Sequence, residues 1–185
     1  MRRFIIFGIV PLFILVSSIS CLTGQRPVPK PKGYFRITLP EKKYQMYLAD
    51  APYSFEYPVY SVIKNDKDKN AELYWINIHF TDFNAAIHVS YKSVNNNINE
   101  LLEDSRTLVY KHTIKAEGIE ENIFVDSVKK VYGTLYDIKG NSASSVQFFL
   151  TDSSKHFFRG ALYFNVPPNK DSLSPVIDFI RKDIV

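Results

Sequence analysis

The sequence predicts an α+β domain in which helices pack on an antiparallel sheet of about six or seven strands. Three observations support this fold class. Tyr and Phe are abundant, with 12 and 14 residues, and aromatic side chains suit the half-buried surface of a sheet. Several stretches alternate between apolar and polar residues, which is the period of a strand. Two further stretches have apolar residues at helical spacing and are segregated from the strands, which favours α+β over a parallel α/β fold.

Residues 1–20 have the layout of a secretory signal peptide. Arg2 and Arg3 precede an almost wholly apolar run, Phe4–Val16, and short side chains follow it. The run is shorter than the ~20 apolar residues that a membrane-spanning helix needs. We therefore expect residues 1–20 to be removed.

The signal ends at Ser20-Cys21, and Cys21 is the only cysteine in the chain. A small residue followed by a thiol is typical of a lipoprotein site, where cleavage frees the cysteine amine and the sulfur carries diacylglycerol. Ser18 stands where an aliphatic residue is usual. The sequence predicts cleavage between Ser20 and Cys21, and lipidation of Cys21 with acyl chains such as palmitate. The alternatives are an ordinary signal peptide with an incidental cysteine and an uncleaved anchor.

Residues 21–33 are predicted to tether a single globular domain, residues 34–185. Pro27, Pro29 and Pro31 recur at every second position, which favours an extended, semi-rigid spacer. The formal net charge is +4, and two of the positive charges lie in the signal. Export and this near-neutral remainder disfavour nucleic acid as a partner.

The predicted strands follow in chain order. Alternation, turn residues and prolines delimit them at residues 34–39, 53–60, 72–80, 85–92, 122–126, 128–138, 146–151 and 157–165. The last of these is apolar on both faces, so we expect it to be central and covered on each side.

The strands at 72–80 and 85–92 are expected to form a hairpin. Their apolar residues share one face only if the numbers of paired residues sum to an odd value. A turn centred on Phe83-Asn84 would place His79 opposite His88 on the more polar face.

Two amphipathic helices are predicted. The first begins at Asn97, with Glu100 as a capping partner, has the apolar stripe Ile98, Leu101, Leu102, Ser105, Leu108, Val109 and His112, and stops before Gly118. The second is expected to start at Ser174-Pro175 as N-cap and first helical residue. Its stripe is Leu173, Val176, Ile177, Ile180 and Ile184.

No residue set predicts catalysis, and we expect neither an enzyme nor a cofactor. His79 and His88 are weak metal-ligand candidates without an evident third ligand. His112 is interpreted as a buried histidine at a helix end. Asp152, His156 and Ser144 or Ser145 are the residue types of a hydrolase triad, but the Gly-x-Ser-x-Gly turn is missing.

Arg159 lies among aromatic residues in the central strand. A charge in that position needs a partner or a path to solvent, so structural pairing is favoured over ligand contact.

Seven stretches together resemble one family over nearly the whole chain after the signal. They are Pro29–Ile37, Pro52–Pro58, Ala86–Tyr91, Tyr110–Thr113, Gly140–Phe149, Arg159–Asn165 and Asp171–Val176. In order and spacing they resemble the gliding-motility lipoprotein family GldD of Bacteroidetes-type bacteria. The order of strands and helices is also loosely similar to the PsbP/Mog1 type of α/β/α sandwich. A similar fold alone does not support an inference about function.

The GldD resemblance implies a cell-envelope lipoprotein required for surface gliding and linked to the type IX secretion machinery. The expected function is that of an accessory lipoprotein acting by protein–protein interaction, anchored by lipid to the inner or outer membrane. Because no acidic run follows Cys21, the domain is expected to face the periplasm. The alternative is an envelope enzyme, or a metal- or small-ligand-binding module, that uses the polar face near His79 and His88.

Overall fold

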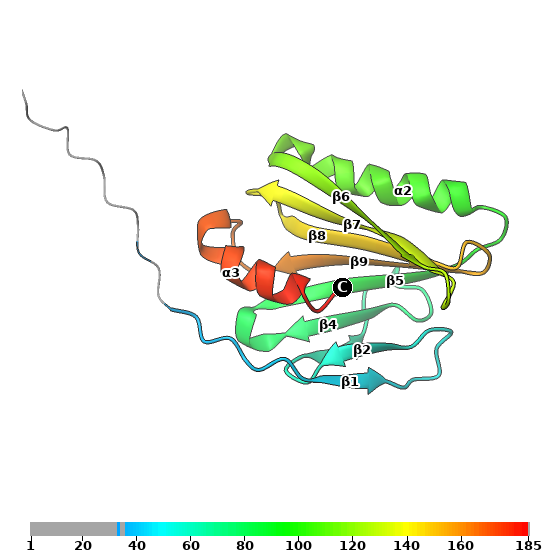
Figure 1. Cartoon of the computed structure of the whole chain (residues 1–185), viewed down its shortest axis with the longest axis horizontal. Helices are drawn as coiled ribbons and strands as arrows, with labels where there is room; N and C mark the ends of the chain where they lie inside the picture. Colours follow the sequence, from blue (N-terminus) through cyan, green and yellow to red (C-terminus); the bar gives the residue numbers. More distant parts are fainter. Residues whose placement is uncertain (1–32, 34–35, 185) are drawn as a thin grey trace, which may run out of the picture. The chain divides into compact units, whose positions relative to one another are not determined.

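The computed structural model describes residues 33 and 36–184 (Figure 1). The chain divides into two units, Met1–Phe35 and Arg36–Val185, and every helix and strand of the described residues belongs to the second. The predicted signal peptide and the cleavage and lipidation site at Ser20-Cys21 lie outside the described residues, as does the tether apart from Gly33. Both remain predictions.

The centre of the second unit is a seven-stranded sheet in the order β3-β4-β5-β9-β8-β7-β6. The strands are β3 (Val62–Asn65), β4 (Ile76–Phe80), β5 (Ala85–Ser93), β6 (Ala116–Asp126), β7 (Val131–Gly140), β8 (Ser144–Thr151) and β9 (His156–Phe164). Every neighbouring pair is antiparallel. β9 is the fourth strand of the seven. The α+β class, the antiparallel sheet and the central position of the last strand are confirmed.

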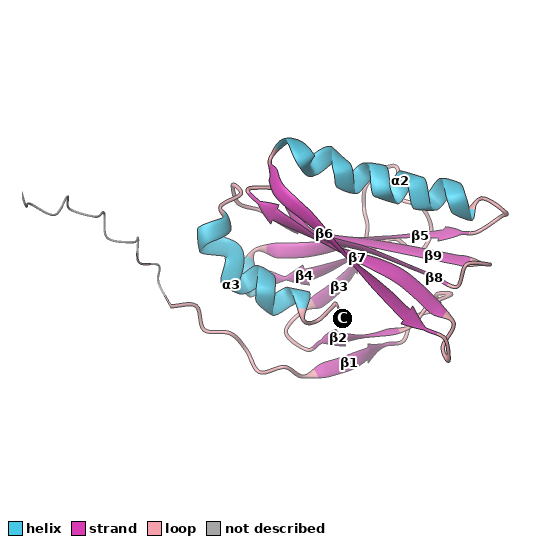
Figure 2. Ribbon diagram, turned by 45° about the horizontal axis from the view of Figure 1, so that its top comes forward, coloured by secondary structure: helices cyan, strands magenta, loops and turns pink. Residues whose placement is uncertain are grey.

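The two faces of the sheet carry different layers (Figure 2). Helix α2 (Ile98–Tyr110) packs on one face, where Leu101 and Val109 meet Tyr136 and Phe157. Helix α3 (Lys170–Arg181) packs on the other. There Val176, Phe179 and Ile180 join the larger core with Ile78, Ile87, Leu135 and Leu162. Neighbouring residues of β7 point to opposite layers, Leu135 toward α3 and Tyr136 toward α2, so the alternation in the sequence becomes the two-sided core.

A separate two-stranded sheet covers more of the α3 face. β1 (Tyr44–Tyr47) pairs with β2 (Phe55–Pro58), and Tyr47, Tyr53 and Phe55 pack on the α3-side core. The rings of Tyr53 and Phe158 meet edge to face, with centroids 4.9 Å apart.

Three strand predictions need correction. Within the predicted strand 34–39, the described residues 36–39 are not extended into a sheet, and β1 forms later. β3 and the first six residues of β6 were not predicted. Gly118 is not a helix stop, because it lies in β6 beside a register shift between Ala116 and Gly118.

The helix starts also differ from prediction. Asn97 is the N-cap residue of α2, but its side chain accepts a hydrogen bond from the Asn95 amide at 2.8 Å, so no capping box with Glu100 forms. Helix α3 starts earlier than expected, with Asn169 as N-cap accepting from the Ser172 amide, which places Pro175 inside the helix.

Two short 3₁₀ segments, η1 (Thr81–Phe83) and η2 (Lys111–Ile114), connect β4 to β5 and α2 to β6. Among the described residues, neither helix has both the length and the apolar character to cross a membrane.

Candidate functional site: an open sheet edge beside an apolar groove

Among the strands that the structure describes, β6 forms one edge of the main sheet and has β7 as its single neighbour. It is 11 residues long, most of its residues are exposed, and none is buried. Three consecutive apolar residues stand out: Ile123 is 81% exposed, Phe124 43% and Val125 60%. A long edge strand with exposed apolar side chains is a template for pairing with another chain.

An apolar groove lies beside this edge on the α3 face and has a volume of about 320 Å³. It is lined mainly by Phe124, Leu135, Phe148, Leu150 and Ile184. We call it the β6 groove. A smaller cavity of about 100 Å³, between the β1–β2 sheet and the main sheet, shares Phe148, Leu150 and Ile184 with it. Together these features make an apolar surface that runs inward from β6.

The wall of the groove is positioned by one buried carboxylate. Arg181, at the end of α3, donates from Nε to Asp137 Oδ1 at 2.6 Å and from Nη2 to Oδ2 at 2.7 Å. Asn122 of β6 donates to the same Oδ2 at 3.0 Å. The hydrogen bond to Asp137 raises the pKa of Arg181. This bidentate pair, supported by Asn122, joins α3, β7 and β6 around the groove.

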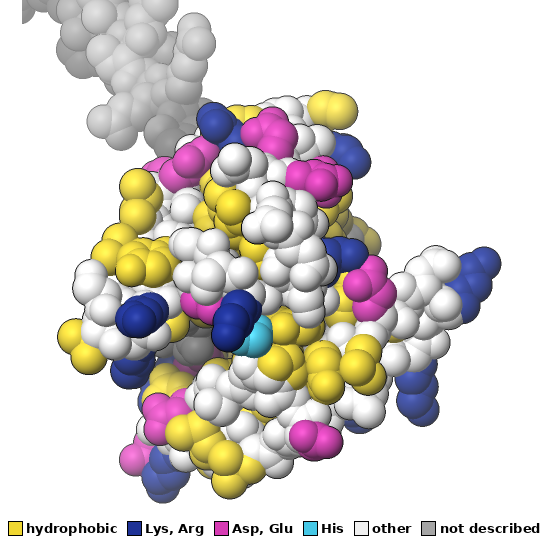
Figure 3. Space-filling view, turned by 90° about the vertical axis from the view of Figure 1, so that its right-hand side faces the viewer, with side chains coloured by type: hydrophobic (Ala, Val, Ile, Leu, Met, Phe, Trp, Pro, Cys, Tyr) yellow, Lys and Arg dark blue, Asp and Glu magenta, His cyan; other side chains and the backbone are white. Residues whose placement is uncertain are grey.

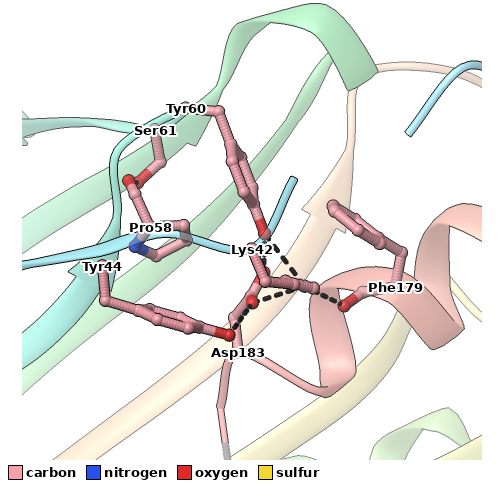
Figure 4. A network of polar contacts seen from close by, with 7 residues as sticks. All are labelled: Lys42, Tyr44, Pro58, Tyr60, Ser61, Phe179 and Asp183. Atoms are coloured by element: carbon pink, nitrogen blue, oxygen red, sulfur yellow. Dashed lines mark hydrogen bonds and ion pairs between the residues drawn. The ribbon is translucent and has the colours of Figure 1, made fainter. Parts of the chain in front are cut away.

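A second polar cluster attaches the N-terminal part of the unit to its C-terminal end (Figure 4). Asp183 accepts from Tyr44 at 2.9 Å and from Tyr60 at 2.6 Å, and it forms an ion pair with Lys42. Lys42 also donates to the Phe179 carbonyl at 2.8 Å and lies 3.5 Å from the centre of the Phe179 ring. Burial and the bond to Asp183 raise the pKa of Tyr60. The cluster positions the segment before β1 against the end of α3.

The two candidate histidines are not opposite each other. The predicted odd-sum register is confirmed, but His79 pairs with Ala86 and His88 pairs with Asn77, two residues away from the prediction. Burial, then Lys64, then His88 lower the pKa of His79. Within the described ranges, no group of three or more His, Cys, Asp or Glu side chains is placed to hold a metal ion.

The residues considered for a hydrolase triad do not come together in the structure. Ser144 pairs with Tyr163, whereas His156 starts β9 at the other end of this antiparallel pair. Burial acts to raise the pKa of Asp152, but hydrogen bonds from the turn amides of Ser154, Lys155 and His156 outweigh it and lower that pKa. Asp152 therefore stabilises the β8–β9 turn.

Arg159 lies in the central strand β9, and His112 lies in η2, directly after α2. Arg159 donates to Gln147 Oε1 at 2.6 Å, and burial lowers its pKa. Burial, followed by the charge of Arg159, lowers the pKa of His112. The partner of Arg159 is thus a neutral amide of the neighbouring strand β8, consistent with the structural pairing that was expected.

Sequence reasoning did not identify the groove. Its lining comes from β6, β7, β8 and the end of α3, which are separated in the sequence. The available signal was Ile123-Phe124-Val125, three apolar residues in a row within a short predicted strand, a pattern that does not fit one buried and one solvated face.

Comparison with known proteins gives a family. The family model described as gliding motility lipoprotein GldD matches residues 24–185. No curated protein matches the chain. Among solved structures, the cyanobacterial PsbP protein (CyanoP) from Synechocystis sp. PCC 6803 is similar, with 11% identity, a TM-score of 0.46, and coverage of 81% of this chain and 96% of that one. Since the family model covers nearly all of the chain beyond residue 23, the chain belongs to the GldD family of gliding-motility lipoproteins.

Proposed function

We propose that this protein is an accessory lipoprotein of the gliding and type IX secretion apparatus that acts by binding a partner protein and not by catalysis. Lipid at Cys21 holds it to the inner or outer membrane, and the domain faces the periplasm. The observation that carries the proposal is the exposed β6 edge with an apolar groove beside it.

The proposed occupant is an extended segment of the partner. Added alongside β6, it would continue the sheet as an eighth strand through main-chain hydrogen bonds. Side chains of a strand alternate between its faces, so every second residue would point toward the β6 groove. We therefore expect a segment whose apolar residues occupy alternate positions.

A second copy of this chain fits the edge poorly. β6 carries Glu117, Glu120, Glu121 and Asp126 and has no basic residue. Lys170 and Lys139 pair with Glu117 and Glu120, whereas Glu121 and Asp126 are in no ion pair of the described residues. Two β6 strands side by side would bring like charges together, which destabilises a pair. The charge of β6 instead favours a partner strand with basic residues.

The test is Ile123→Lys in a gliding bacterium that has this chain as its only copy. Ile123 is 81% exposed, so the substitution leaves the core intact but places a charge on the docking edge. The matched control is Ile114→Lys, since Ile114 is 91% exposed in η2. We expect Ile123→Lys, at normal protein level, to abolish or strongly reduce gliding and export, and Ile114→Lys to leave both intact.

Photocrosslinking from position 123, compared with position 114, identifies the partner. Recovery of a motility or secretion component from position 123 alone supports the proposal. If Ile123→Lys cells glide and export cargo like wild-type cells, the β6 edge is not the docking site.

The anchor is tested separately by metabolic labelling with palmitate. The wild-type protein should carry label and fractionate with membranes, whereas Cys21→Ala should be unlabelled. Label in the variant would contradict lipidation at Cys21.

A further inference from the structure

A second cavity, remote from β6, combines aromatic rings with carboxylates. It has a volume of about 380 Å³ and is bordered by the β1–β2 connection and by the segment between β3 and β4. Its aromatic lining is Tyr47, Tyr53, Tyr74 and Trp75. We call it the aromatic–acidic pocket. It lies at the end of the unit that Figure 3 faces, where groups of hydrophobic side chains lie among charged ones.

The charged residues that line this pocket all have the same sign. They are Asp50, Asp66 and Glu72. Glu72 forms an ion pair with Lys92 at 2.6 Å. Within the part of the chain that the structure describes, Asp50 and Asp66 are in no ion pair. The pocket thus offers two carboxylates that are outside the ion pairs of the described residues, and Asp66 Oδ1 accepts a hydrogen bond from the Asp68 amide at 2.8 Å.

The aromatic walls are held by contacts with one another and with Tyr91. The Tyr53 hydroxyl donates to the Tyr74 carbonyl at 2.5 Å, and the Trp75 indole Nε1 donates to the Tyr91 carbonyl at 3.0 Å. Tyr47 stacks on Tyr53, with ring centroids 6.1 Å apart. Because the rings are positioned without a ligand, little side-chain ordering remains for binding.

An intramolecular contact shows which chemistry the rings attract. Lys92 Nζ, the partner of Glu72, lies 6.0 Å from the centre of the Trp75 ring. The negative face of an aromatic ring attracts cations, and Trp does so best. One ring of the pocket, Trp75, thus already faces a cation, and the lining adds three more rings together with Asp50 and Asp66.

We propose that the aromatic–acidic pocket binds an organic ammonium ion, received by the rings and balanced by Asp50 and Asp66. The cation is either a lysine side chain of a bound protein or a small soluble amine, and the two share this chemistry. The pocket shares no lining residue with the β6 groove. A failed test of cation binding would therefore leave the proposed docking edge unaffected, and the reverse also holds.

Trp75 is the only tryptophan in the chain, so its fluorescence reports on this pocket alone. The experiment titrates the full chain, in a nonionic detergent without choline, with tetramethylammonium chloride and with Nα-acetyl-lysine amide. The neutral controls are tert-butanol and Nα-acetyl-norleucine amide, at matched ionic strength. Both cations should give a saturable change in Trp75 emission, and the neutral compounds should not.

Three variants make the test specific. Asp50→Asn and Asp66→Asn retain a hydrogen-bond acceptor but remove the charge, and each should weaken binding roughly two- to fivefold. Lys92→Gln removes the competing cation and frees Glu72, and it should tighten binding by about the same factor.

Saturation by the lysine analogue at much lower concentration than tetramethylammonium would identify a primary ammonium, and therefore a protein side chain, as the favoured source. The reverse order would identify a small quaternary amine. The proposal is overturned if neither cation saturates, if the neutral compounds act equally, or if both Asp→Asn variants bind as the wild type does.

Discussion

At the scale of single residues, two glycines are required because other atoms occupy the space of a side chain. At Gly133 in β7 a Cβ would lie 2.2 Å from the Phe149 carbonyl oxygen, and at Gly160 in β9 it would lie 2.3 Å from the Phe148 ring. Phe148 lines both the β6 groove and the cavity beside it. Gly160 therefore leaves room for the Phe148 ring beside β9.

These contacts predict an order of stability among three Gly→Ala variants. Gly133→Ala meets backbone and should lower the free energy of unfolding by about 3 kcal/mol, and Gly160→Ala, which meets a ring that can tilt, by about 1–2 kcal/mol. Gly118→Ala is the control, since nothing lies within 4 Å of its Cβ position. Urea unfolding of the three proteins measures the order. A Gly133→Ala protein as stable as Gly118→Ala would contradict the close packing of β7 on β8.

At the scale of elements, strands with strict alternation could be predicted and short or edge strands could not. β4, β5, β7, β8 and β9 have apolar residues on the buried face and lie within or close to the predicted ranges, but β4 starts at Ile76 and not at residue 72, and β7 starts at Val131 and not at residue 128. β1 and β3 have four residues each and β6 is mostly exposed, so burial leaves little periodic signal in them.

The sequence predicted the positions of turns and helix starts only in part. The Asp152-Ser153-Ser154 turn was placed correctly, but the role of Asp152 emerges only when the three amides that point at its carboxylate are seen. The start of α3 was misplaced because Ser174-Pro175 has the residue types of a helix start, while Asn169 forms the cap.

The β8–β9 turn has a predictable pH dependence. The amides hold the pKa of Asp152 below its usual value near 3.8, so its stabilising effect is complete above that pH and is lost as the pH falls below it. Asp152→Ala should cost about 1 kcal/mol at pH 7, a figure discounted for solvent screening. Asp152→Asn, which retains the acceptor, should cost less.

Urea unfolding at several pH values measures this effect. The difference between the wild type and Asp152→Ala should narrow as the pH falls from about 5 toward 2, because the wild-type carboxylate then takes up a proton. A difference that stays constant across this range would show that the charge of Asp152 does not contribute.

At the scale of the whole molecule, function depends on contacts between distant parts of the sequence. The β6 groove combines Asn122, Phe148 and Ile184, and the pair Asp137–Arg181 closes its wall. The sequence pattern predicts which residues are buried together in one layer, but not which exposed residues of different elements share a cavity. For this reason the fold class could be predicted, while the groove and the aromatic–acidic pocket required the structure.

The Lys42–Asp183 ion pair is where the N-terminal segment of the unit is attached to the rest. The Asp183 side chain is only 2% exposed, and Lys42 reaches it across 141 positions in the sequence. Lys42→Met leaves this carboxylate buried with two tyrosine hydroxyls and no cation, which should cost about 2–3 kcal/mol. The matched control is Lys43→Met, because Lys43 pairs with Glu41 where both side chains are more than half exposed.

Hydrogen exchange separates a local effect of Lys42→Met from a global one. β1 and β2 form a two-stranded sheet that lies on the core, and the Lys42 cluster is a polar attachment at its base. We expect faster exchange of amides in Tyr44–Tyr47 and Phe55–Pro58, with β5 and β9 unchanged, since sub-global opening precedes unfolding of the core. If Lys42→Met leaves exchange in these strands unchanged, Asp183 is not the attachment point, and stacking of Tyr47 and Phe55 on the core suffices to hold this layer. Equal acceleration by Lys43→Met would show that the effect is not specific to the buried ion pair.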